Sequence, residues 1–241
     1  DLRLVSRRLE NLNSLCRAFE SCDDHPDRVF FVETRRWSDG SVHAWFVSSQ
    51  LDVGGVLSEA VYQVFPTVGF TSATLTVGGE FTFWANRIGL DRGGRDLITR
   101  RLPSPFDYQR NVLLAVPEDA PPPTDPGYQS YLNKLLVDVL EVSEGGALVL
   151  FTSYQMLQAS HQAVRESLAA FGVTVLRQGD DDRARLLTRF TDDLSSVLFA
   201  TESFWQGVDA PGATLRLLVI CRLPFRVPNE PVVAARMEAI E

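Results

Sequence analysis

The segment from Ser196 to Phe225 constrains the fold of this chain more than any other stretch. It contains two short apolar runs, 197–200 and 215–221, with a polar loop between them. Such runs, bounded by polar residues, Gly and Pro, are typical of strands buried on both faces of a parallel sheet. In open α/β sheets ligands bind beyond the carboxyl ends of the strands, so the loop after 197–200 is the first candidate site. Its notable residues are Thr201, Ser203, Trp205, Gly207 and Asp209.

Strands and helices alternate through the second half of the chain. The apolar spacing predicts helices over 128–142, 154–171 and 183–190 and further strands over 147–151 and 173–176. Strict alternation implies right-handed crossovers between parallel strands, with helices packed on the faces of the sheet. We therefore expect an α/β fold with a parallel sheet flanked by helices.

The first half has a less regular pattern. It predicts an amphipathic helix over 2–19, a strand pair over 29–33 and 42–48 around the turn at 38–40, helices over 55–65 and 81–88, and a strand over 68–70. A last helix is expected over 232–241. Proline-rich breaks interrupt the pattern most strongly between 103 and 126. We place the hinge at 76–105, which divides the chain into 1–75 and 106–241.

Hydroxyl side chains follow two further predicted strands. The run Thr71–Thr74 comes after 68–70, and Thr152 and Ser153 come after 147–151. A helix that starts directly after a strand presents free backbone N–H groups and a partial positive charge, which suit a phosphate. Alternatively, the hydroxyls only cap a turn and the N-terminus of a helix.

Composition limits the kinds of partner and site. The net charge of −8 argues against a broad basic face for nucleic acid, although a local phosphate-binding groove stays compatible with it. The chain has only three cysteines, Cys16, Cys22 and Cys221, and their spacing is not that of a metal site. We therefore expect no metal site, and we expect these cysteines to be free thiols in a reducing, cytoplasmic compartment. No apolar run is long enough for a membrane helix, so no membrane partner is expected.

Three strand-end segments, in this order, resemble helicase motifs III, IV and V of the DinG family, the bacterial relatives of the XPD helicases in superfamily two. They are FTSATL at 70–75, LVLFTSY at 148–154 and ATESFWQGVD at 200–209, with RLPF following at 222–225. The resemblance implies two RecA-like motor domains that bind ATP and Mg²⁺ in the cleft between them and move 5′ to 3′ along single-stranded DNA. Residues 1–75 would be the tail of motor domain 1, and 106–241 would be motor domain 2.

The resemblance also implies roles for individual residues on the nucleotide side. Gly207 and Asp209 would lie at the nucleotide cleft, with Asp209 near the ribose. Ser72, Ala73 and Thr74 of motif III would couple ATP hydrolysis to domain movement.

On the DNA side, Ser153 and Tyr154 would face the phosphates, and Thr201 and Ser203 would contact the backbone. Trp205 would either stack on bases or anchor the loop. The family further implies a bacterial, nucleoid-associated protein that acts as a monomer on single-stranded or forked DNA in repair or replication.

Several family features are absent from this sequence. It contains no G-x-x-x-x-G-K-[ST] phosphate loop, no DEAH-type box and no arginine-rich motif VI. An iron–sulphur (4Fe–4S) cluster, if the whole protein has one, would lie outside this chain. We therefore interpret the chain as a fragment that is inactive by itself. The alternatives are a RecA-like binding or scaffold module without motor activity and, less well supported because no G-x-G-x-x-G turn is present, a Rossmann-like transferase.

Overall fold

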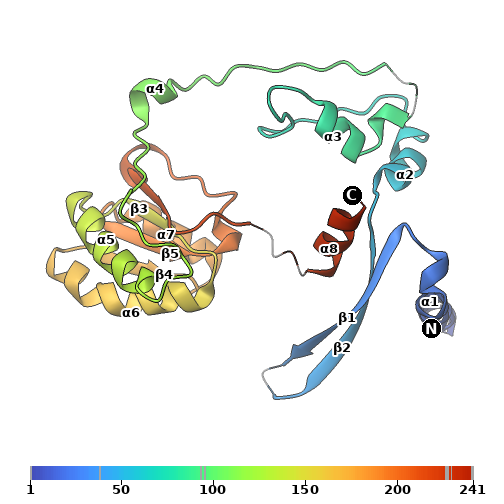
Figure 1. Ribbon diagram of the computed structural model, residues 1–241, viewed down its shortest axis with the longest axis horizontal. Coiled ribbons are helices and arrows are strands. Elements are labelled where there is room, and N and C mark those ends of the chain that lie inside the picture. Colours follow the sequence, from blue (N-terminus) through green and yellow to red (C-terminus); the bar gives the residue numbers. More distant parts are fainter. Residues whose placement is uncertain are drawn as a thin grey trace. The chain divides into compact units, whose positions relative to one another are not determined.

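The computed structural model describes residues 2–37, 39–92, 94, 96–225, 228 and 230–239 (Figure 1). Its contacts divide the chain into two compact units. Unit 1 comprises Asp1–Asp107 and Arg226–Glu241, and unit 2 comprises Tyr108–Phe225. The assignment of 1–75, 76–105 and 106–241 to a motor-domain tail, a hinge and a second motor domain stays a prediction.

Unit 2 is built on a four-stranded parallel sheet with the strand order β4-β5-β3-β6. The strands are β3 (Ala147–Leu150), β4 (Thr174–Arg177), β5 (Ser196–Ala200) and β6 (Leu217–Ile220). The helices are α4 (Tyr108–Asn111), α5 (Tyr128–Val142), α6 (Tyr154–Ala170) and α7 (Arg183–Asp192), and the short 3₁₀ turns are η4 (Glu202–Phe204) and η5 (Gly212–Thr214). The predicted fold class, a parallel α/β sheet flanked by helices, is confirmed. Because β3 separates β5 from β6, these last two strands form a crossover and not a hairpin.

Alternate residues of the sheet enter two separate cores. Val149 and Phe199 belong to a cluster with apolar side chains of α5 and α6. Leu148 and Leu198 belong to a second cluster, which includes Phe190 of α7. Side chains of successive strand residues point to opposite faces, so a strand covered on both faces is apolar throughout. This explains the uninterrupted apolar runs of β3 and β5.

Strand β6 does not fit the prediction of a strand buried on both faces. Leu218 and Ile220 are 50% and 44% exposed. Leu217 and Val219 pack against the α5 and α6 core, but no β6 residue is a member of the α7 core among the described residues. The cause is strand order, since β6 lies at the edge of the sheet beyond the part that α7 covers.

Unit 1 contains a long hairpin and several helices. The antiparallel strands are β1 (Arg28–Arg36) and β2 (Val42–Gln50). The helical elements are α1 (Leu2–Glu20), η1 (Cys22–Asp24), α2 (Gly54–Leu57), η2 (Ser58–Tyr62, a π-helical turn), α3 (Thr82–Arg87), η3 (Leu90–Arg92) and α8 (Pro231–Glu238). The predicted turn at 38–40 includes Ser38, and the predicted last helix includes 240–241, which lie outside the described residues.

Two predictions for unit 1 are wrong in detail. Residues 68–70 form no strand. A strand needs a hydrogen-bonded neighbour, and in the described part of unit 1 only β1 with β2 and an isolated bridge from Val77 to Glu80 are paired. Phe70 packs instead against the ring of Trp84. The helix predicted over 55–65 changes from α to π geometry and ends at Tyr62, whose hydroxyl donates to the carbonyl of Ile88.

None of the described helices is both long and apolar enough to cross a bilayer. In the same part of the chain no cluster of His, Cys, Asp and Glu is arranged to hold a metal ion. Cys16 and Cys22 are exposed free thiols, whereas Cys221 is buried. Burial raises the pKa of the Cys221 thiol to about 12, so this side chain stays neutral at physiological pH.

Two glycines with similar positive φ angles give a test of how tightly the sheet is packed. Gly145 has φ +82° and Gly172 has φ +76°. A Cβ on Gly145 would lie 2.2 Å from the carbonyl oxygen of Ser195, whereas one on Gly172 would meet open space. Gly172→Ala should therefore lower the free energy of unfolding by about 1–2 kcal/mol from backbone strain alone. Gly145→Ala should lower it by about 1–3 kcal/mol more, because β3 and β5 must separate. Equal losses in denaturant titrations would contradict this packing.

Candidate nucleic-acid interface

The candidate site lies where three parallel strands of unit 2 end. Leu150 of β3 is paired with Ala200 of β5, and Arg177 of β4 is paired with Phe199 of β5. The next residues along each strand therefore emerge at one edge of the sheet. The backbone N–H of Phe151 donates to the carbonyl of Ala200 at 2.9 Å, which extends the pairing to this edge.

Ser153 is the N-cap of α6. Its backbone is extended (φ −140°, ψ 132°), and its Oγ accepts a hydrogen bond from the backbone N–H of Met156 at 3.2 Å. The capping interpretation of this hydroxyl is thus confirmed. The cap uses the oxygen of Ser153 and leaves its hydrogen available to another acceptor.

Gln178, which follows β4, connects the other hydroxyl residues of this edge. Its Oε1 accepts from the backbone N–H of Thr201 at 2.7 Å and from Thr201 Oγ1 at 2.9 Å. Its Nε2 donates to Ser203 Oγ at 3.2 Å. Its backbone carbonyl accepts from Tyr154 Oη at 2.8 Å. The segments after all three strands are therefore joined through one residue.

Sequence reasoning did not identify Gln178. The adjacent Gly179 explains how Tyr154 can approach it: Gly179 has φ +99°, and a Cβ there would lie 2.1 Å from Tyr154 Oη. The sequence feature that could have indicated Gln178 is its position before Gly179 and directly after an apolar strand, whose end lies at the same edge as the other two strand ends.

The loop after β5 is anchored by its aromatic residues. Phe204 is only 2% exposed and belongs to the α7 core. Trp205 is partly buried against the same core, and its Nε1 is enclosed without a hydrogen-bond partner in the described part of the chain. This packing supports the role of loop anchor for Trp205, and its stacking on bases stays a prediction.

Arg183 holds the following turn of the loop. Its Nη2 donates to the carbonyls of Gln206 at 3.1 Å and Gly207 at 2.8 Å, and its guanidinium lies 5.2 Å from the centre of the Phe204 ring. Gly207 has φ +68°, a conformation that glycine adopts without strain. Asp209, two residues further on, is exposed.

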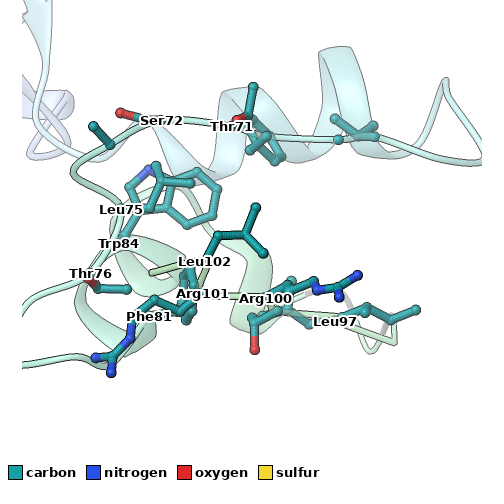
Figure 2. A pocket seen from close by; sticks show the side chains of 16 residues that line it. Thr71, Ser72, Leu75, Thr76, Phe81, Trp84, Leu97, Arg100, Arg101 and Leu102 are labelled. Atoms are coloured by element: carbon teal, nitrogen blue, oxygen red, sulfur yellow. The ribbon is translucent and has the colours of Figure 1, made fainter. Parts of the chain in front are cut away.

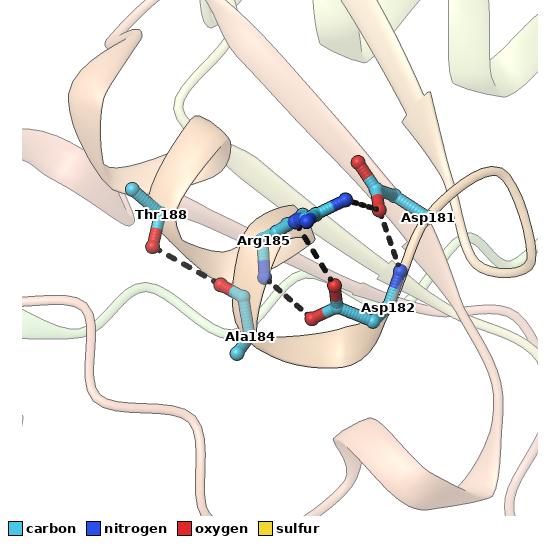
Figure 3. A network of polar contacts seen from close by, with 5 residues as sticks. All are labelled: Asp181, Asp182, Ala184, Arg185 and Thr188. Carbon is cyan, nitrogen blue, oxygen red and sulfur yellow. Dashed lines mark hydrogen bonds and ion pairs between the residues drawn. The ribbon is translucent and has the colours of Figure 1, made fainter.

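The start of α7 fixes the position of Arg183, the first residue of that helix. Asp182 is the N-cap and accepts from the backbone N–H of Arg185 at 3.0 Å. The guanidinium of Arg185 forms ion pairs with Asp182 at 3.2 Å and Asp181 at 3.5 Å, as Figure 3 shows. Among the described residues Arg185 forms its hydrogen bonds and ion pairs with Asp181 and Asp182 and none with the loop after β5, so it offers a matched comparison for Arg183.

The motif III residues belong to unit 1. The backbone N–H of Thr74 donates to Ser72 Oγ at 3.2 Å, and the two hydroxyl oxygens are 3.3 Å apart. Ser72 and Ala73 line a cavity of about 360 Å³, to which Arg100 and Arg101 contribute from the predicted hinge (Figure 2). In this view the hydroxyl of Ser72 and the two guanidinium groups point in different directions and do not converge on one point.

The predicted site residues thus fall into two groups, one in each unit. At the sheet edge Tyr154 is linked through Gln178 to Thr201 and Ser203, and Ser153 precedes Tyr154 after the neighbouring strand. Gly207 and Asp209 continue the loop of Thr201 and Ser203. Ser72, Ala73 and Thr74 form a separate turn in the other unit.

Comparison with known proteins identifies the type of domain. Residues 136–241 match the family described as helicase C-terminal domain. The chain contains a DinG-type helicase C-terminal region. The match includes β3 to β6 and therefore both hydroxyl-bearing strand ends of the candidate interface.

Curated DinG-type relatives align with most of this chain. It is 35% identical over 198 residues to the ATP-dependent DNA helicase YoaA of Escherichia coli, covering 82% of this chain and 30% of the relative. It is 39% identical over 193 residues to the ATP-dependent helicase DinG of Mycobacterium tuberculosis, covering 79% and 28%. It is 31% identical over 244 residues to the 3'-5' exonuclease DinG of Bacillus subtilis, covering 96% and 25%. The chain therefore spans less than a third of these relatives.

Arg183→Ala tests the anchoring of the loop. The change removes two hydrogen bonds from a charged donor, so the amides of 202–209 should exchange with solvent deuterium about tenfold faster. Hydrogen exchange with mass spectrometry measures this rate. Arg185→Ala, which removes only exposed ion pairs on the same helix, should leave the exchange of these amides unchanged. Equal effects of both substitutions would show that Arg183 does not hold the loop.

Proposed function

We propose that the whole protein to which this chain belongs is an ATP-dependent DNA helicase and that residues 106–241, which include unit 2, are its RecA-like second motor domain. One observation carries the proposal: four hydroxyl residues gather at the carboxyl edge of a parallel sheet in a DinG-type helicase C-terminal region. They are Ser153, Tyr154, Thr201 and Ser203. Hydroxyl and backbone N–H groups can hold a phosphate backbone without a broad basic surface, which agrees with the net charge of −8.

The loop after β5 would connect DNA to nucleotide. Thr201 and Ser203 stand at its start, where single-stranded DNA would pass, and Gly207 and Asp209 stand at its end, where ATP would bind with Asp209 near the ribose. The anchored middle of the loop would transmit movement from one end to the other, because Phe204 is buried and Arg183 holds the turn. In this mechanism the differential affinity of the closed and open forms for ATP drives domain closure and release.

Other parts of the mechanism follow from the family. Ser72, Ala73 and Thr74 in the tail of motor domain 1 (1–75) would couple hydrolysis to movement across the hinge at 76–105. ATP and Mg²⁺ would be held mainly outside this chain, since the sequence has no phosphate loop, and for the same reason the chain alone should be inactive. We further propose 5′ to 3′ movement on single-stranded or forked DNA in repair or replication, by a monomeric, cytoplasmic, nucleoid-associated protein. A 4Fe–4S cluster would belong to the remainder of the protein.

Asp209→Ala in the full-length protein tests this function. DNA-stimulated ATP hydrolysis should fall by about tenfold or more, since a contact on the nucleotide side of the loop is lost. Asp138→Ala removes an exposed carboxylate of α5 and is the matched control. A second assay measures unwinding of forked duplexes with a 5′ or a 3′ tail. Wild-type ATPase stimulation in Asp209→Ala would remove this residue from the mechanism.

A second candidate is a binding or scaffold module without motor activity, which the absence of a phosphate loop from this sequence favours. The same assays separate the two: a scaffold would bind single-stranded DNA but hydrolyse no ATP when DNA is added. Because one relative is named an exonuclease, the unwinding assay should use end-labelled strands and score their length. Shortened strands without unwinding would point to a nuclease.

A further inference from the structure

The orientation of the Gln178 side-chain amide is determined by its surroundings. A backbone N–H can only donate, so the atom of Gln178 that lies 2.7 Å from the nitrogen of Thr201 is the carbonyl oxygen Oε1. The amide nitrogen Nε2 is then the atom 3.2 Å from Ser203 Oγ. The direction of each hydrogen bond at this edge follows from this assignment.

Two hydroxyl groups use their only hydrogen inside the protein. Thr201 Oγ1 lies 2.9 Å from Gln178 Oε1, which can only accept, so the threonine donates. Tyr154 Oη lies 2.8 Å from the backbone carbonyl of Gln178 and donates for the same reason. Neither group can donate to a phosphate while these bonds are intact, although both oxygens can still accept.

Ser203 is in the opposite situation. Its Oγ accepts from Gln178 Nε2, and its side chain is exposed, so its hydrogen is free for an external acceptor. A hydroxyl that already accepts a hydrogen bond is polarised and becomes a better donor. The Oγ of Ser153 likewise accepts a hydrogen bond, from the backbone N–H of Met156, so its hydrogen is also free to donate.

Phosphate oxygens of DNA only accept hydrogen bonds. A hydroxyl group can therefore donate to the strand only if its hydrogen is not already used inside the protein. We propose that Gln178 is a positioning residue that divides the sheet edge into anchors, Thr201 and Tyr154, and a free donor, Ser203. This inference rests on the proposed function, in which this edge binds single-stranded DNA. It assigns the phosphate contact to Ser203 and a structural role to the hydroxyl of Thr201.

The test compares single-stranded DNA affinity of full-length variants by fluorescence anisotropy, with a fluorescein-labelled oligothymidine probe and no nucleotide. Ser203→Ala should weaken binding about tenfold, as expected for one hydrogen bond to a charged group. Thr201→Val keeps the side-chain shape and the N–H bond to Gln178, so it should weaken binding less than about threefold. The reverse order of effects would overturn the assignment.

A double-mutant cycle tests the role of Gln178 itself. Gln178→Ala should weaken binding several-fold, and the double variant with Ser203→Ala should bind no more weakly than Ser203→Ala alone, because both remove the same contact. Additive losses would overturn the inference. Thermal denaturation checks that each variant is folded.

Gln178→Glu provides a variant of nearly the same shape. It keeps an acceptor for Thr201 but replaces the donor, so the hydrogen of Ser203 turns inward, and binding should fall at least as far as in Ser203→Ala. Gln162→Glu, on the exposed side of α6, adds the same charge and should change affinity by less than twofold. If Ser203→Ala weakens binding while both Gln178 variants bind like wild type, only the role of Gln178 fails. If no variant alters affinity, the sheet edge does not bind DNA, and the inference fails together with this part of the proposed function.

Discussion

The parallel pairing of β3, β4 and β5 is the constraint on which the candidate interface depends. Because the three strands run in the same direction with Leu150 beside Ala200 and Arg177 beside Phe199, their following residues emerge together. Residues separated by 24 and 23 positions in the sequence then come within hydrogen-bonding distance, as Tyr154 does with the backbone carbonyl of Gln178 and Thr201 with its side chain. An antiparallel arrangement would send alternate strand ends to opposite edges of the sheet.

The loop after β5 contains both buried and exposed residues. Phe204 is held in the α7 core, and Arg183 fixes the backbone at Gly207, whereas Ser203 and Asp209 remain exposed. A loop whose apolar residues are anchored can present its polar residues with a defined geometry, which lowers the entropy cost of binding a ligand. This division explains how a short segment can belong both to the core and to the proposed binding surface.

The sequence predicted the alternating half of the chain well and the remainder less well. The bounds of α5 were predicted at Tyr128 and Val142, because its apolar periodicity is regular and its ends are marked. Gln178 was missed because its partners depend on which strands are neighbours in the sheet, a lateral order that periodicity does not contain. The exposure of Leu218 has the same cause, since an apolar run does not reveal that its strand lies at an edge. The strand predicted over 68–70 failed because pairing partners cannot be read from one segment.

The central claim is that the carboxyl edge of this sheet contacts the DNA backbone through Ser203 while the end of the same loop contacts the nucleotide. The most direct measurement is a structure of the full-length protein with single-stranded DNA and a non-hydrolysable ATP analogue. The account predicts a phosphate oxygen about 3 Å from Ser203 Oγ and the ribose within hydrogen-bonding distance of Asp209. A DNA strand that runs along another surface of unit 2, with Ser203 open to solvent, would contradict it.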